Sequence, residues 1–178
     1  MNNSRKTLLI SSSCSGFTII ELLLYVAIAS ILLLASSLFL SVLLESRVKN
    51  QTIAEVEGQG AAVLHILTQS VRNAESINTP SPGSSASSMS LATVVSGNNP
   101  TVFDLSSGTF RMKEGSSLAI ALTNTRVIVS NLTFTNLSRS STPGTVRIRF
   151  TVTSVNTSGR NEYSFSKIFT TSATLRQP

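Results

Sequence analysis

The feature that most constrains this chain of 178 residues is an uncharged, apolar stretch from Leu22 to Leu44. Its strongest polar interruptions are Tyr25 and isolated serines. At ~1.5 Å per residue, a helix of about 23 residues spans roughly 35 Å, enough to cross a bilayer with some tilt. The sequence therefore predicts one transmembrane helix near the N-terminus, followed by a more polar domain.

A single carboxylate, Glu21, stands immediately before this stretch. An ionised side chain in a membrane segment is costly and usually functional, so it is expected to have a partner. Its place at the start of a helix is favourable, because the helix dipole stabilises negative charge there. The plainer alternative is that Glu21 marks the interface end of an ordinary membrane anchor.

The leader before the helix is arranged differently from a conventional secretory signal. Arg5 and Lys6 come first, then a polar spacer, then Gly16, and only then the apolar run. A secretory signal has its apolar core before the cleavage site, whereas a cut after Gly16 would leave the apolar helix on the mature protein. The basic leader predicts that the N-terminus is cytoplasmic and that the chain after Leu44 lies outside the cytoplasm.

The one cysteine of the chain, Cys14, excludes an internal disulfide and raises the alternative of a lipoprotein site. The apolar segment before it is only Leu8 to Ile10, which is shorter than a secretory core. The long apolar run follows the cysteine, so the order of segments argues against lipoprotein processing.

The run Gly16-Phe17-Thr18-Ile19-Ile20-Glu21, with the apolar helix after it, resembles the class III signal of type IV pilins and type II secretion pseudopilins. The resemblance implies that a prepilin peptidase cuts between Gly16 and Phe17 and that Phe17 is then N-methylated. It also implies that Glu21 acts in assembly by neutralising the new amine of its own chain or of a neighbouring subunit. The implied partners are other pilins or pseudopilins and an inner-membrane assembly platform.

One departure from that family concerns the type of subunit. Major pilins commonly carry a helix-breaking glycine and proline in the hydrophobic segment, whereas here the first proline of the chain is Pro80. Without a proline the helical hydrogen-bond ladder is uninterrupted, and the helix is expected to be straighter. This favours a minor pilin or minor pseudopilin.

Beyond the membrane, apolar residues recur at spacings of three, four or seven, which predicts an amphipathic helix. They are Ile53, Val56, Val63, Leu67, Val71 and Ala74. Gly58 and Gly60 lower the helix propensity of this segment and allow a bend. His65, the one histidine, is expected to be a partly buried helix residue and not a metal ligand.

Short alternating runs separated by turn residues predict an antiparallel sheet after the helix. They are 91–95, 101–105, 109–113, 118–122, 126–129, 132–137, 145–152 and 162–175. In the strongest, Thr145 to Val152, apolar residues alternate with Arg147, Arg149 and Thr151. We expect an α+β, pilin-like fold, in which a long N-terminal helix packs on a C-terminal antiparallel β-sheet.

The predicted organisation has five parts. They are a cleaved basic leader (1–16), a transmembrane and assembly helix (17–45), an amphipathic stalk helix (46–78), a loop rich in Ser, Pro and Gly (79–90) and an antiparallel β-rich outer domain (91–178).

Nothing in the sequence predicts catalysis, a cofactor or a metal site. Asp104 is the one aspartate, no serine stands in a nucleophile elbow, and there is no phosphate-binding glycine loop. An enzyme is therefore not expected.

The net charge of +6 comes with only 12% charged residues, so it is a sparse excess of basic side chains. Its largest cluster is Arg147 and Arg149, which either form part of a solvated strand face or bind an anionic polymer such as DNA. The functional prediction is a structural fibre subunit. The alternative is a membrane-anchored adhesive or DNA-binding β-domain, including a competence pilus subunit.

Overall fold

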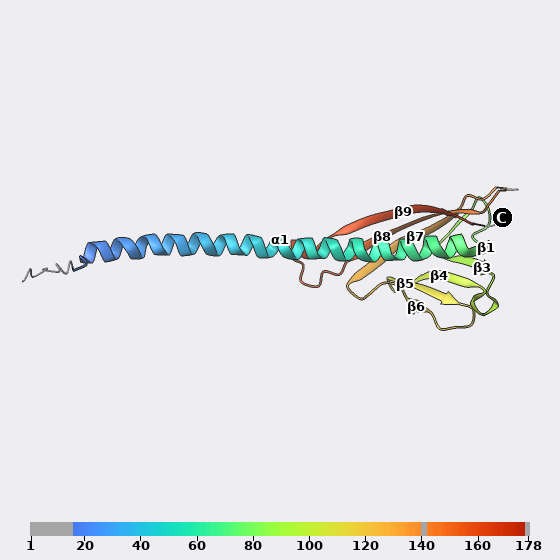
Figure 1. Cartoon of the computed structure of the whole chain (residues 1–178), viewed down its shortest axis with the longest axis horizontal. Coiled ribbons are helices and arrows are strands. Elements are labelled where there is room, and N and C mark those ends of the chain that lie inside the picture. Colours follow the sequence, from blue (N-terminus) through green and yellow to red (C-terminus); the bar gives the residue numbers. More distant parts are fainter. Residues whose placement is uncertain (1–15, 140–141, 177–178) are drawn as a thin grey trace, which may run out of the picture. The chain divides into compact units, whose positions relative to one another are not determined.

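The computed structural model describes residues 16–139 and 142–176. The chain divides into two compact units, Met1–Leu43 and Leu44–Pro178. One helix, α1 (Ile19–Asn73, 55 residues), contributes to both (Figure 1). Cys14 and the basic leader before it lie outside the described residues.

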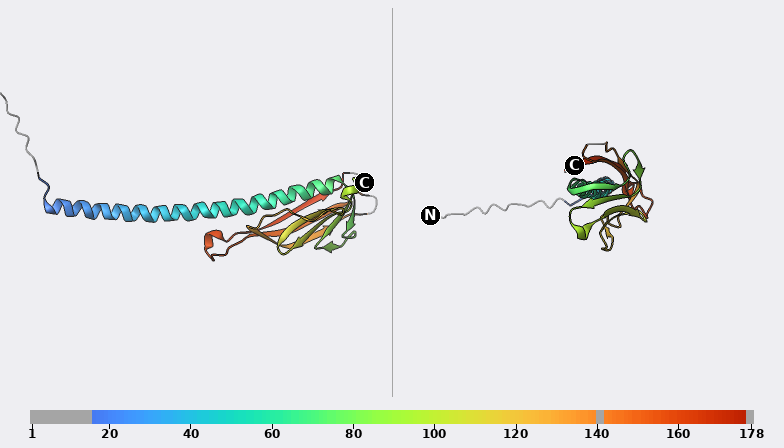
Figure 2. Two further views of the ribbon diagram at one scale, coloured as in Figure 1. Left: turned by 90° about the horizontal axis from the view of Figure 1, so that it is seen from below. Right: turned by 90° about the vertical axis from the view of Figure 1, so that its right-hand side faces the viewer.

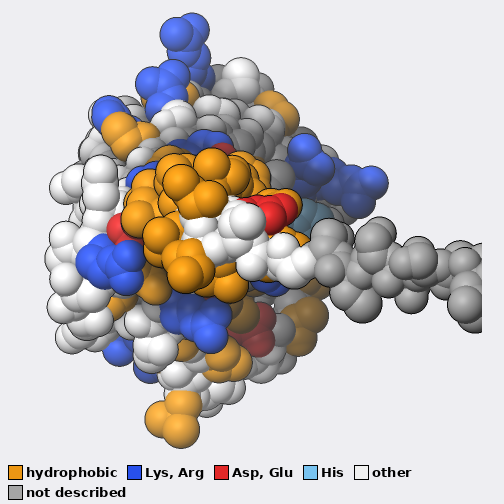
Figure 3. Space-filling model, turned by 90° about the vertical axis from the view of Figure 1, so that its left-hand side faces the viewer, with side chains coloured by type: hydrophobic (Ala, Val, Ile, Leu, Met, Phe, Trp, Pro, Cys, Tyr) orange, Lys and Arg blue, Asp and Glu red, His pale blue; other side chains and the backbone are white. Residues whose placement is uncertain are grey.

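In the first unit, α1 is apolar and has no protein packed against it. None of its most apolar window is buried, and it is long and apolar enough to cross a membrane. Figure 3 looks at the helix from its N-terminal end and shows hydrophobic side chains around it. An apolar surface of this kind needs lipid or other subunits to cover it, so this part of the helix suggests a membrane anchor.

Three of the four serine hydroxyls between Leu22 and Leu44 are bonded inside the helix. Each donates a hydrogen bond to the backbone carbonyl four residues earlier: Ser30 (2.7 Å), Ser36 (2.8 Å) and Ser41 (3.1 Å). Polar groups in hydrocarbon must be bonded within the protein, and this back-bonding meets that requirement.

The second unit combines the rest of α1 with two antiparallel sheets among its described residues. The first sheet has the order β1-β3-β4-β5-β6, with β1 (Ala74–Thr79), β3 (Met89–Thr93), β4 (Thr101–Ser106), β5 (Thr109–Glu114) and β6 (Ile120–Ala121). The second has the order β2-β7-β8-β9, with β2 (Ser85–Ala86), β7 (Val127–Asn136), β8 (Thr145–Ser154) and β9 (Ser166–Thr174).

One hydrophobic core joins the helix and both sheets of this unit. The helix contributes fully buried residues at the spacing expected of one face: Val56, Val63, Leu67 and Val71. Phe110 of β5 packs edge-on against Phe134 of β7 and Phe150 of β8, with ring centroids 6.5 and 5.7 Å apart. In the end-on view of Figure 2 the strands lie around one side of α1. The structure confirms the α+β architecture of a long helix packed on antiparallel sheets.

The alternation predicted for the strongest strand is also present. The apolar residues of β8 are completely buried, namely Val146, Ile148, Phe150 and Val152. Arg147 and Arg149 between them are exposed, so β8 has one face in the core and one in solvent.

The stalk helix ends at Asn73, five residues before the predicted end at residue 78. Ala74, predicted on the helix stripe, is buried in β1, which pairs with β3. The backbone of residues 74–79 makes its hydrogen bonds with a strand further along the chain. The spacing of apolar residues within the segment cannot predict such a distant partner.

The β region differs from the prediction in further respects. The loop predicted over 79–90 contains β2, which pairs with β7, and β3 begins at Met89. The strands expected at 126–129 and 132–137 are one strand, β7, with an irregularity between Ser130 and Thr133. Residues 161–163 form a short 3₁₀ turn, so β9 begins only at Ser166. The expected single sheet is therefore two sheets around one core.

Gly60, predicted to allow a bend, instead gives room for an aromatic ring. It is buried on α1, and a Cβ placed there would overlap the side chain of Phe169 in β9. The ring of Phe169 is in turn stacked on Phe150, with centroids 5.5 Å apart. The absence of a side chain at Gly60 thus lets β9 approach the helix.

We predict that Gly60→Ala destabilises the second unit by about 1–3 kcal/mol, because the added methyl group must displace a packed ring. The matched control is Gly58→Ala on the same helix, where a Cβ would meet nothing within 4 Å. That change should stabilise the helix by up to about 1 kcal/mol. The rate of hydrogen exchange of the β8 and β9 amides, in the full chain in micelles, measures the change in stability of both variants. Equal exchange in the two variants would contradict the packing role of Gly60.

Candidate functional site

The start of α1 is formed by a capping interaction. The backbone N–H of Glu21 donates to Oγ1 of Thr18, the residue before the helix, at 3.3 Å. The pattern Thr-x-x-Glu is a capping box, in which the glutamate side chain ordinarily reaches back to the cap. Here Oε1 of Glu21 instead accepts a hydrogen bond from the hydroxyl of Tyr25, at 3.4 Å. The carboxylate therefore has a partner on the next turn of the helix.

Phe17, which precedes the helix, is followed at intervals of four residues by Glu21 and Tyr25, which share one face of α1. The rings of Phe17 and Tyr25 lie edge to face, with centroids 5.9 Å apart. Glu21 is half-buried, whereas every other described residue from Gly16 to Arg47 is exposed. We call these three residues the N-terminal cluster.

Sequence reasoning identified Phe17 and Glu21 but missed Thr18 and Tyr25 as members of this site. The capping-box spacing from Thr18 to Glu21 and the four-residue step to Tyr25 were both visible in the sequence. What the sequence did not contain is the direction of the Glu21 side chain.

The peptide bond predicted to be cut lies outside the helix. Gly16 and Phe17 precede Ile19, where α1 begins, and both are exposed, Phe17 to 73%. A Cβ at Gly16 would meet nothing within 4 Å. The bond is thus accessible to another protein, and its cleavage stays a prediction.

Residues 11–37 match a family model described as a prokaryotic N-terminal methylation motif. No curated protein and no solved structure matches the chain significantly. The motif includes Gly16, Phe17 and the whole N-terminal cluster. The match covers the predicted cleavage site and the first part of α1, a helix long and apolar enough to cross a membrane, and it supports a class III signal peptide of the kind found in pilin-type proteins. Such a motif implies processing by a prepilin peptidase and assembly with other pilins.

The structure places the other predicted site, Arg147 and Arg149, on the outer face of the second sheet. Arg149 is flanked in register by Thr133 and Thr170. On the same face, Arg147 is flanked by a threonine of β7 and a serine of β9. The strands β2, β7, β8 and β9 contain no Asp or Glu.

Three other basic side chains of the outer domain, Arg111, Arg160 and Lys167, are paired with acids. Arg111 forms two hydrogen bonds with the carboxylate of Asp104 across β4 and β5, at 2.9 and 2.8 Å. These bonds raise the pKa of the Arg111 guanidinium. Lys167 contacts Glu57 of α1 at 2.6 Å. Within the described part of the chain, Arg147 and Arg149 have no such ion pair.

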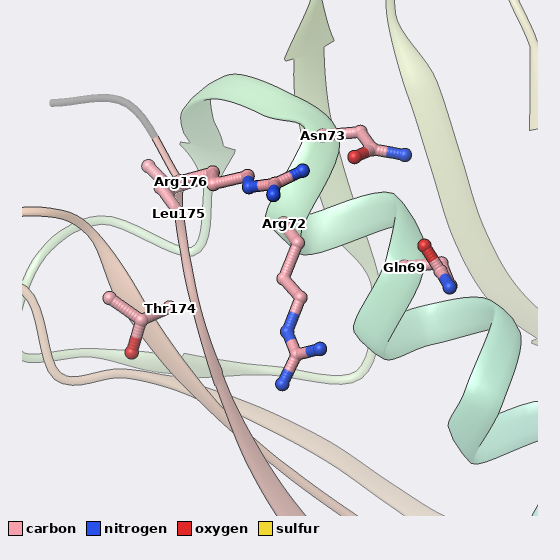
Figure 4. A pocket seen from close by; sticks show the side chains of 6 residues that line it. All are labelled: Gln69, Arg72, Asn73, Thr174, Leu175 and Arg176. Carbon is pink, nitrogen blue, oxygen red and sulfur yellow. The ribbon is translucent and has the colours of Figure 1, made fainter.

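An open depression of about 540 Å³ lies at the C-terminal end of α1, lined by Gln69, Arg72, Asn73, Thr174, Leu175 and Arg176. A cation in the last helical turn, as at Arg72, is favoured by the helix dipole. Figure 4 shows that the side chains of Arg72 and Arg176 extend in different directions. They do not converge on one anion, so this depression is not a candidate binding site.

The described residues contain no group of three or more His, Cys, Asp or Glu side chains that could hold a metal ion. His65 lies on α1 as predicted, but it is exposed and not partly buried. The helix stripe turns toward the sheets through Val63 and Leu67, and His65 falls outside it.

We predict that Thr18→Ala loosens the first turn of α1 by about 1 kcal/mol, because the N–H of Glu21 loses its acceptor. Thr18→Ser retains a hydroxyl and is the control. In micelles, amide exchange at Glu21 should quicken about fivefold in the alanine variant only. The capping role is wrong if both variants exchange alike.

Proposed function

We propose that this chain is a minor pilin or minor pseudopilin, a structural subunit of a type IV pilus or a type II secretion pseudopilus. A prepilin peptidase cuts it after Gly16, and Phe17 becomes the N-methylated first residue. One helix holds it in the cytoplasmic membrane, with the domain after Leu44 outside the cytoplasm. It is then assembled with other pilins or pseudopilins by an inner-membrane platform. The proposal includes no catalytic step and no cofactor.

The observation that carries this proposal is Glu21, half-buried at the head of an uncovered apolar helix and inside the methylation motif. Cleavage at Gly16 creates an ammonium group at Phe17. A carboxylate four residues further on, in the first turn of the helix, is suited to neutralise an ammonium in apolar surroundings. If that ammonium belongs to a neighbouring subunit, the pair also sets the axial register between the two helices.

The bare apolar surface of α1 supports assembly through this helix. In the membrane lipid covers the surface, and in a fibre the helices of neighbouring subunits take its place. The transfer exposes no unsatisfied serine hydroxyl at Ser30, Ser36 or Ser41, because each is bonded to its own helix. The unbroken helix from Ile19 to Asn73, without a proline, supports a minor subunit over a major pilin.

The test is co-expression of the full chain with a prepilin peptidase, followed by mass spectrometry of the N-terminal peptide. We expect a chain that begins at methylated Phe17. Glu21→Gln should still be cut but should enter fibres about tenfold less or worse, because an unpaired ammonium in apolar surroundings costs several kcal/mol. Glu45→Gln, the same change further along the helix, is the control.

An uncut chain, or one lipidated at Cys14, would refute the proposed processing. Normal assembly of Glu21→Ala, at the usual level and in register, would refute the role of the carboxylate.

A second candidate function is favoured by the acid-free face around Arg147 and Arg149. Two exposed arginines stand at alternate positions of β8, and these backbone positions are about 7 Å apart along the strand. Hydroxyl side chains flank both of them. Such a face suits an anionic polymer such as DNA, and the chain would then be a membrane-anchored binding module or a competence pilus subunit.

For this second function we predict that the domain from Leu44 onward binds a single-stranded DNA oligonucleotide and that added salt weakens the binding. Arg147→Gln and Arg149→Gln should each weaken binding and reduce the salt slope by about one. Arg111→Gln is the control, since Asp104 neutralises that side chain. Binding that is absent, or insensitive to salt, removes this candidate.

A further inference from the structure

The contacts within the N-terminal cluster point to a role for Tyr25, a residue that the methylation motif itself does not explain. Glu21 is half-buried on a helix segment whose other described side chains are exposed. The hydroxyl of Tyr25 donates to it, and the ring of Tyr25 lies edge to face with the ring of Phe17, which precedes the helix. The two aromatic residues therefore bracket the carboxylate along the helix.

In the unassembled subunit this carboxylate needs a hydrogen-bond donor. A charged group in apolar surroundings without a donor is costly. Before cleavage the chain has no ammonium at Phe17, and before assembly no neighbouring subunit supplies one. The hydroxyl of Thr18 already accepts the backbone N–H of Glu21. Among the described residues, the side chain that donates to the carboxylate is Tyr25.

The length of this bond indicates that it is easily exchanged. The Oη to Oε1 distance of 3.4 Å is longer than the usual 2.5–3.0 Å for a hydroxyl donor. A hydrogen bond between an ammonium and a carboxylate is shorter and about twice as strong as a neutral one. An ammonium that approaches the carboxylate therefore replaces the Tyr25 hydroxyl at a small cost in free energy. The carboxylate is already directed toward Tyr25 along the helix and not back toward Thr18.

We infer that Tyr25 is a positioning residue for Glu21. Its hydroxyl donates a hydrogen bond to the carboxylate while the subunit is in the membrane. During assembly the ammonium of a neighbouring subunit replaces the hydroxyl as the partner of the carboxylate. The inference rests on the proposed function of the chain as a fibre subunit. Without the hydroxyl, the carboxylate turns toward the water beyond the helix end, and fewer subunits present it correctly.

The competing explanation is that Tyr25 is an aromatic ring at the membrane interface, where tyrosine is generally favoured. Tyr25→Phe separates the two, because it keeps the ring that meets Phe17 and removes only the hydroxyl. Ser30→Ala is the matched control: it removes a hydroxyl from the same helix, one that is bonded to the carbonyl of Val26 and not to Glu21.

The first measurement is spectroscopic and needs no cleavage or assembly. The chain has two tyrosines, so the Tyr163→Phe form of the full chain, labelled with ring-deuterated tyrosine, reports on Tyr25 alone. In lipid bilayers we expect the infrared C–O band of that tyrosine to shift on Glu21→Gln and to stay unchanged on Ser30→Ala. If Glu21→Gln leaves the position of this band unchanged, the inference is wrong, even if the chain is processed as a pilin.

The second measurement compares mature subunits in fibres with those left in the membrane. Tyr25→Phe should lower the assembled fraction about three- to tenfold, the range expected for the loss of one hydrogen bond of ordinary net strength, since this bond is long. Cleavage and methylation at Phe17 should be unaffected, and Ser30→Ala should assemble normally. If Tyr25→Phe assembles as well as the wild-type chain, the inference that Tyr25 positions Glu21 for assembly is wrong. An unprocessed wild-type chain instead refutes the proposed function and leaves the spectroscopic result on Tyr25 standing.

Discussion

The structure depends on one constraint, which is that the first half of α1 is apolar on every side and has no protein over it. Such a surface is stable only against lipid or against other helices of the same kind. The helix is prepared for both settings, because Ser30, Ser36 and Ser41 bond to its own backbone. The one charge from Phe17 to Leu44 is Glu21, at its head.

The second half of the same helix, in contrast, is packed against the protein on one face. From Val56 to Val71 one face is fully buried against two sheets, and Gly60 admits the ring of Phe169. This half is therefore tied to a particular folded domain, whereas no described residue buries the most apolar window of the first half. In the proposed fibre, the first half would meet neighbouring subunits and the domain would face the surroundings. That division suits a fibre in which subunits share a helical centre and differ outside it.

Strand β8 shows how that outer domain separates stability from recognition. Its inner residues fill the core with Phe150 and its apolar neighbours, and its outer residues include Arg147 and Arg149. Since side chains alternate between the two faces, the outer positions can change without disturbing the packing. Lys49 of α1 donates to the carbonyls of Asn161 and Ser164 and links the turn before β9 to the helix.

The sequence by itself determined the apolar helix, the cleavage motif, the place of Glu21 and the two faces of β8. These features are local: they depend on periodicity or on residues within a few positions of one another. Tertiary structure decided the helix end at Asn73, the joining of β7 into one strand and the division into two sheets. Those depend on pairing between distant segments, such as β1 with β3 and β2 with β7. The partnership of Tyr25 with Glu21 depends on the direction of one side chain, which spacing permits but does not specify.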